Sequence, residues 1–79
     1  MPTGVILAYS VPSGAQVLID RRAQYTIFGI ARTPAMIHGV AAGVHHVTFT
    51  LVGYEDVIMT IDVPQGGFST TTAILHSKT

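Results

Sequence analysis

Apolar residues alternate with polar ones through much of the chain, and glycine and proline interrupt the alternation at regular intervals. Such alternation is typical of half-buried β-strands, and no segment keeps the 3.6-residue period of an amphipathic helix. Val, Ile and Thr, which favour strands, supply about a third of the residues. A loop or irregular strand is expected through the twenties. The predicted strands are Gly4–Tyr9, Ala15–Asp20, Ala35–Val40, Val44–Val52, Asp56–Val63 and Phe68–Leu75.

Turn signals lie between the predicted strands. In Val11-Pro12-Ser13-Gly14, proline suits the second position of a type I turn and glycine the fourth, so this segment is predicted to turn the first strand into the second. Later signals are "GVAAG" (39–43), "VGYED" (52–56) and "PQGG" (64–67). Short strands with such spacing predict an all-β fold, a small antiparallel two-sheet β-sandwich of about six or seven strands.

The length of the chain limits its core. With 79 residues it forms at most one domain, and a chain of this size buries only about 60% of the surface that its unfolded form exposes. It has no cysteine, which excludes disulfides and thiolate metal sites. Oligomerisation is the remaining common source of additional buried surface.

Charge is sparse. Only 10% of the residues are charged and the net charge is zero, whereas soluble domains usually carry about 25%. This argues against nucleic-acid binding, which needs a basic surface, and against disorder. No segment approaches the ~20 apolar residues of a membrane span. The chain shows no signal peptide, so processed, excised and intracellular forms all stay open.

Several short motifs follow one another in a characteristic order along the chain. They are Pro12-Ser-Gly14-Ala15, Val17-Leu-Ile-Asp20, Thr33-Pro34, Ala42-Gly43-Val-His45-His-Val47 and Gly53-Tyr54. Together they resemble the PEGA domain, whose Pro-Glu-Gly-Ala turn reads Pro-Ser-Gly-Ala here. The resemblance covers roughly residues 4–75, within a single domain at 1–79. It implies a small β-sandwich similar to modules of surface-layer and other cell-surface proteins, with no enzymatic activity and no cofactor.

The chain departs from the family pattern after Asp20. Arg21 stands where the family has a turn glycine, and Thr33 lies thirteen residues beyond Asp20, an insertion of about five residues. The conformation of the segment from Arg21 to Arg32 therefore stays open.

Titratable residues offer little chemistry. His45 and His46 are adjacent on a predicted strand, so their side chains leave on opposite faces and cannot share one ion. We expect no metal site, and expect His45 to bond main-chain groups near the Gly43 turn. Glu55-Asp56 is expected in a solvated turn. No nucleophile motif or carboxylate cleft is recognisable, so no catalytic residue is predicted.

Aromatic and arginine side chains in the insertion give one binding hypothesis. Tyr25 and Phe28, with Arg21 and Arg32, are candidate glycan contacts, although a loop that buries both aromatics is the simpler interpretation. Tyr54 is expected to cover one end of the core.

The outward side of the first strand is apolar where a solvated strand should be polar. This side carries Val5, Leu7, Tyr9 and Val11, and Leu18 and Ile58 repeat the pattern on other strands. The lone lysine is Lys78, so the first strand is also predicted to offer an unguarded edge. The six apolar residues form the candidate self-association face.

The sequence thus favours a non-enzymatic structural module that self-associates, as a homo-oligomer or an open-ended filament, or that contacts neighbouring domains of a surface assembly. The alternatives are a carbohydrate-binding module and a passive spacer from a longer cell-surface protein. A cell-surface or extracellular location follows from the resemblance alone.

Overall fold

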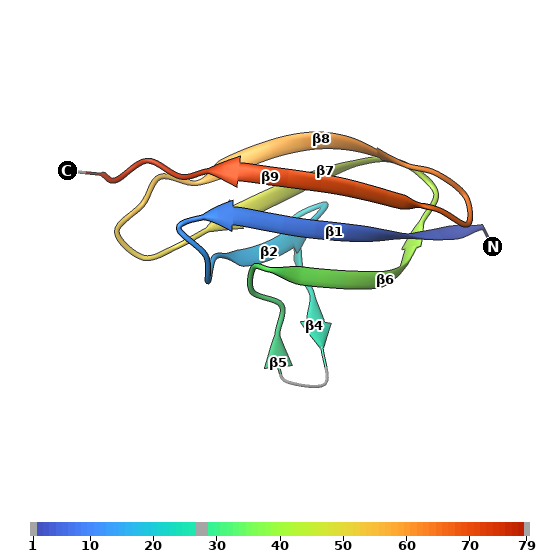
Figure 1. The fold of residues 1–79 in the computed structure, drawn as a ribbon, viewed down its shortest axis with the longest axis horizontal. Coiled ribbons are helices and arrows are strands. Elements are labelled where there is room, and N and C mark those ends of the chain that lie inside the picture. The colour runs from blue at the N-terminus through green and yellow to red at the C-terminus, as the bar shows by residue number, and fades with distance from the viewer. Residues whose placement is uncertain (1, 27–28, 79) are drawn as a thin grey trace.

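The computed structural model describes residues 2–26 and 29–78, and no helix occurs in these ranges (Figure 1). The strands are β1 (Thr3–Val11), β2 (Gln16–Ile19), β3 (Arg22–Ala23), β4 (Tyr25–Thr26), β5 (Gly29–Ile30), β6 (Ala35–Ala41), β7 (Gly43–Thr50), β8 (Val57–Val63) and β9 (Phe68–Ile74). Each of the six strands predicted from the sequence is present, and no predicted end differs from the observed one by more than two residues.

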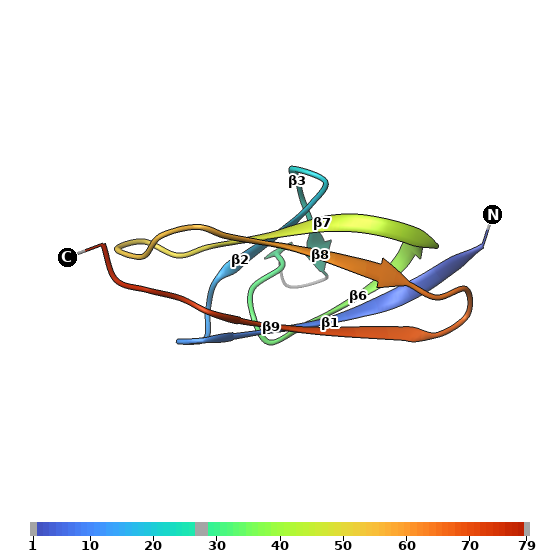
Figure 2. The ribbon, with the colours of Figure 1, turned by 90° about the horizontal axis from the view of Figure 1, so that it is seen from above.

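The main strands form two layers, which Figure 2 shows edge-on. One sheet has the order β6-β1-β9 and the other has the order β3-β2-β7-β8. Strands β4 and β5 form a separate hairpin that projects from the body of the sandwich (Figure 1). The predicted all-β two-sheet sandwich is confirmed.

One strand pair runs parallel, which the antiparallel prediction did not include. Strand β9 lies beside β1 with Val5 opposite Phe68 and Val11 opposite Ile74. The reason is the path of the chain, because residues 64–67 carry it from β8 in one sheet to β9 in the other. After this crossing, β9 enters the three-stranded sheet in the direction of β1.

The Pro12–Gly14 segment also crosses between sheets. Strands β1 and β2 do not pair, so the predicted turn from strand to strand is not a hairpin. The main-chain N–H of Gly14 instead donates to the carbonyl of Thr33 at 2.9 Å. Gly14 has a φ of +93°, a conformation that residues with a Cβ rarely adopt.

The core lies between the sheets and follows the alternation in the sequence. Ile6 and Ala8 of β1 are fully buried, as are Val17 of β2 and Val47 and Phe49 of β7. Tyr54 packs against this cluster, as predicted from the sequence. The outward positions of the same strands are therefore the ones available for contact with other molecules.

The first part of the insertion forms a tight hairpin between β2 and β3. Ile19 pairs with Arg22, which leaves Asp20 and Arg21 as the two loop residues, with φ values of 50° and 67°. Two positive φ angles are typical of a type I′ turn, in which glycine is preferred. Phe28 lies outside the described residues.

Candidate functional site

The outward side of β1 is apolar, as the sequence predicted. Tyr9 is 42% exposed and Val11 is 58% exposed, while Val5 and Leu7 are half-buried among their neighbours. Their inward counterparts Ile6 and Ala8 are fully buried. The two sides of this strand therefore differ in burial but not in polarity.

Neighbouring strands extend this apolar surface across the sheet. Met36 of β6 is opposite Leu7, Phe68 of β9 is beside Val5, and Ile74 is beside Val11. These three side chains are 51%, 67% and 57% exposed, respectively. None of the residues in β1, β6 and β9 is Asp, Glu, Lys or Arg. We call this surface the outer face; it comprises Val5, Leu7, Tyr9, Val11, Met36, Phe68 and Ile74.

The outer face has members that the sequence analysis missed. Met36, Phe68 and Ile74 were not in the candidate set, because the sequence does not show that β6 and β9 lie beside β1 in one sheet. The alternation on β9, where Thr71 and Ala73 are buried and Ile74 is exposed, was the signal that could have found them.

Two predicted members of the candidate face belong to the other sheet. Leu18 of β2 and Ile58 of β8 each pair with Thr48 of β7, so they share a row on the outside of the four-stranded sheet. The predicted set is therefore divided between opposite sides of the sandwich, because the sequence did not show which strands share a sheet.

The expectation of an unguarded edge on the first strand is wrong. Strand β1 is central in its sheet, between β6 and β9 (Figure 1). Both rows of its main-chain polar groups face these neighbours, so β1 offers only its outward side chains. The free edges of this sheet belong to β6 and β9.

A buried polar cluster holds the Pro-Ser-Gly-Ala segment. The Thr33 hydroxyl oxygen accepts from the main-chain N–H groups of Gly14 and Ala15, each at 3.0 Å. The Ser10 hydroxyl donates to the carbonyl of Pro12 at 2.8 Å. The proton between the hydroxyls, which are 2.5 Å apart, therefore comes from Thr33. These bonds explain structurally why a Thr-Pro motif accompanies the turn motif.

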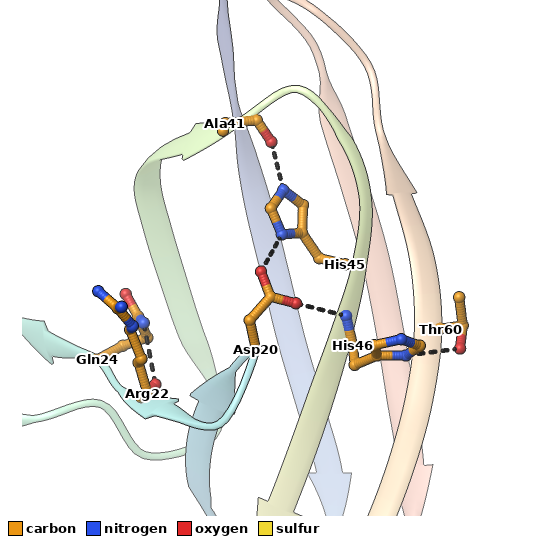
Figure 3. Close-up of polar contacts among 7 residues, drawn as sticks. All are labelled: Asp20, Arg22, Gln24, Ala41, His45, His46 and Thr60. Carbon is orange, nitrogen blue, oxygen red and sulfur yellow. Dashed lines mark hydrogen bonds and ion pairs between the residues drawn. The ribbon is translucent and has the colours of Figure 1, made fainter.

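Asp20 and His45 form the closest ionic contact in the described chain. The Asp20 carboxylate lies 2.6 Å from Nδ1 of His45, and its other oxygen accepts from the main-chain N–H of His46 at 3.0 Å (Figure 3). Nε2 of His45 lies 2.6 Å from the carbonyl of Ala41, which agrees with the expected main-chain bond near the Gly43 turn. His45 of β7 thus contacts the turn between β2 and β3, through Asp20, and the turn between β6 and β7, through Ala41.

The ion pair shifts both protonation equilibria toward the charged forms. Hydrogen bonds from His45 and from the main chain of His46 lower the pKa of Asp20. The hydrogen bond to Asp20, helped by the one to Ala41, raises the pKa of His45. The side chain of His45 is mostly buried and that of Asp20 is about half exposed. We interpret the pair as a brace for the strained turn at Asp20 and Arg21.

The histidines do not gather around a common point. His46 turns to the other side of β7, where its ring contacts the hydroxyl of Thr60 at 3.1 Å (Figure 3). His38 lines a depression of about 600 Å³ with Asp20, Arg22 and His45. In the described part of the chain, no three His, Asp or Glu residues are grouped so that they could hold a metal ion.

The candidate glycan contacts are not brought together by the described structure. Arg21 lines a depression with His46 and Ile58, whereas Arg32 lines another with Gln16 and Tyr54. The Arg32 guanidinium donates to the carbonyl of Gly14 at 3.3 Å. Phe28 is outside the described residues, and for Tyr25 only the main-chain pairing with Ile30 is described.

The described residues form a small two-sheet sandwich whose outer face is apolar and carries no Asp, Glu, Lys or Arg. A family model described as the PEGA domain matches residues 3–76, so the chain belongs to the PEGA domain family. Members of this family are non-catalytic modules associated with cell-surface proteins. Comparison with curated proteins and with solved structures gave no significant match. Over residues 2–26 and 29–78, the chain has no helix long and apolar enough to cross a membrane.

Proposed function

We propose that this PEGA domain is a structural module that associates with further copies of itself in a cell-surface assembly, and that the outer face of the three-stranded sheet is the contact surface. The observation that carries the proposal is the absence of formal charge from β1, β6 and β9, together with the exposure of their apolar side chains. Contiguous exposed apolar patches on soluble domains mark interaction sites.

The energies of association fit this assignment. Moving a large apolar side chain fully out of water contributes roughly 1.5–3 kcal/mol. Ordering two molecules against each other costs about 4–15 kcal/mol. The face has five exposed apolar side chains, namely Tyr9, Val11, Met36, Phe68 and Ile74. Their burial against a second copy offsets much of this cost.

The proposal is tested by light scattering on the wild type beside a Tyr9→Lys, Phe68→Lys double variant. Both positions are exposed, so the variant should keep its fold while like charges repel across the contact. Val52→Lys is the matched control, because Val52 is 98% exposed in the loop between β7 and β8, away from the face. We expect the wild type and the control to form the same assembly, and the double variant to form smaller particles because the contact through the outer face is lost.

A monomeric wild type at tens of micromolar would contradict the proposal and would favour a passive spacer. A folded double variant that assembles like the wild type would exclude the outer face as the contact.

A further inference from the structure

Strand β9 has one free edge. Within the described residues it pairs with β1 alone. The main-chain carbonyl of Gly67 accepts from Val5 at 3.0 Å, and the N–H of Leu75 donates to Val11 at 2.9 Å. Because the direction of these groups alternates along a strand, the odd-numbered residues of β9 face β1. The N–H and C=O groups of Phe68, Thr70, Thr72 and Ile74 therefore point away from the sheet.

This edge lacks the features that usually prevent strand addition. Charged side chains, bulges and very short strands protect most sheet edges. Strand β6 has a register irregularity opposite the Gly4–Ile6 segment of β1. Strand β8 carries Asp62, and β3 has only two residues. By contrast, β9 has seven residues, "FSTTTAI", with neither charge nor proline, and its register with β1 is continuous.

The sandwich is also less well closed on the side of β8 and β9. On the inner face of β8, the side chains of Val57, Met59 and Ile61 remain half-buried, whereas Val47 and Phe49 of the adjacent β7 are fully buried. Between these two strands, the Thr71 hydroxyl of β9 donates to the Met59 sulfur of β8 at 3.3 Å. A molecule that extends the sheet from β9 would also cover this row.

We infer that two copies of the chain pair through β9, antiparallel and centred on Thr71, so that their three-stranded sheets join into one. The inference rests on the proposed self-association and specifies how two copies meet. In this register Phe68 lies opposite Ile74 of the second copy, and Thr70 lies opposite Thr72 of the second copy. All four outward-pointing residues of each β9 then exchange main-chain hydrogen bonds, which no shifted register achieves.

Three observations favour a second copy as the occupant. The two-fold arrangement places apolar Phe68 beside apolar Ile74 at both ends of the joint strand pair. It brings no like charges together, since β9 has none. It also places the half-buried side chains of both β8 strands, Val57, Met59 and Ile61, on the same side of the joined sheet. There, the β8 side chains of one copy cover those of the other. The two outer faces become continuous, so edge pairing and face packing together provide the two contacts that a growing assembly needs.

Cysteine cross-linking tests the register, because the native chain has no cysteine. In the inferred pair, Thr71 faces Thr71 of the second copy as a non-hydrogen-bonded pair, with Cα atoms about 4.5 Å apart, within disulfide range. Thr72 does not face itself. Under a mild oxidant, Thr71→Cys should form a covalent dimer and Thr72→Cys should not. A mixture of Thr70→Cys and Thr72→Cys chains, both altered at exposed positions, should form mixed dimers.

A main-chain variant tests the edge independently of side chains. Thr72→Pro removes an N–H that points away from β1, so the ladder within the domain is kept. We expect its dimer dissociation constant to rise about tenfold or more, since each pair loses two hydrogen bonds. Thr72→Val keeps the N–H and should dimerise like the wild type. Circular dichroism and a thermal melt check that each variant is folded.

The outcomes separate the two proposals. A monomeric wild type overturns both. A dimeric wild type whose Thr71→Cys variant fails to cross-link, together with a folded Thr72→Pro variant of unchanged affinity, overturns the β9 pairing and leaves self-association in place. Cross-linking of Thr72→Cys alone likewise excludes this register. If Thr71→Cys cross-links and the Tyr9→Lys, Phe68→Lys variant assembles like the wild type, the outer face is excluded as a contact and the pairing through β9 is supported.

Discussion

The Thr33 hydroxyl donates to the Ser10 hydroxyl across a distance of 2.5 Å, and both side chains are buried. Ser10 lies near the end of β1, and Thr33 precedes β6, the neighbour of β1 in the same sheet. The Thr33 oxygen also accepts from Gly14 and Ala15, which lead into the second sheet. One side chain therefore fixes the point where the chain passes from one layer to the other.

Removing the Thr33 hydroxyl should destabilise the fold. Thr33→Val keeps the shape of the side chain but leaves the N–H of Ala15 and the Ser10 hydroxyl without this partner. An unsatisfied buried polar group costs about 1–3 kcal/mol, so we expect a loss of about 2–3 kcal/mol in the free energy of unfolding, measured with urea. Thr33→Ser retains the hydroxyl and should lose less. Equal losses for the two variants would show that packing, not hydrogen bonding, explains the role of Thr33.

Replacing Arg21 by glycine should stabilise the protein. Arg21 has a φ of 67°, and this conformation costs a residue with a Cβ roughly 1–2 kcal/mol. Glycine adopts it freely but gains about 0.4–1 kcal/mol of entropy in the unfolded chain. We expect a net gain of roughly 0.5–1 kcal/mol for Arg21→Gly. The control is Arg22→Gly in β3, where no positive φ occurs and a loss is expected. A loss at Arg21 would show that its side chain makes a stabilising contact.

Adding a methyl group at Gly4 should be costly. A Cβ built there would lie 2.5 Å from the carbonyl oxygen of Pro64 and 2.6 Å from the side chain of Val63. The main-chain oxygen cannot move without distorting the crossing into β9. Forced overpacking typically costs about 1–3 kcal/mol, and we expect Gly4→Ala to fall at the upper end in thermal melts. Gly67→Ala is the control, because its nearest neighbour is a proline ring carbon at 3.0 Å. Similar melting temperatures for the two variants would contradict this account.

The fold was predictable from sequence as far as alternation and turn residues reach. The inward positions Ile6, Val17 and Phe49 follow directly from the period of two in their strands. Sheet membership did not follow, because alternation shows which side chains share a face of one strand but not which strands are neighbours. This is why Leu18 and Ile58 were grouped with residues of the other sheet, and why β1 was given an edge that belongs to β9.

The insertion after Asp20 shows a second limit of prediction from sequence. The sequence placed Arg21 where the family has glycine but could not show that its main chain keeps the glycine conformation. Nor could it reveal that Asp20 contacts His45, because twenty-five residues separate them. Contacts of this length depend on the pairing of β2 with β7, which no local pattern specifies.

The Asp20–His45 pair should make stability depend on pH in two directions. The pKa of His45 is raised above about 6.5, so its stabilising contribution is complete below that pH and is lost as the pH rises through the raised value. The pKa of Asp20 is lowered below about 3.8, so its contribution is present above that pH and is lost as the pH falls through the lowered value. Stability from the pair is therefore greatest between about pH 4 and 6.5.

We expect the urea midpoint of the wild type to fall between pH 6 and pH 9, and this fall should shrink in both Asp20→Asn and His45→Gln. The Asn variant keeps an oxygen that can accept from the main chain of His46, so it removes the charge with little change in shape. His76→Gln is the control, because His76 is exposed and its main-chain carbonyl accepts from the N–H of Glu55, a bond that the substitution leaves in place. A pH dependence that persists undiminished in both variants would assign it to groups other than this pair, and the ion pair would then be a surface contact of little energetic weight.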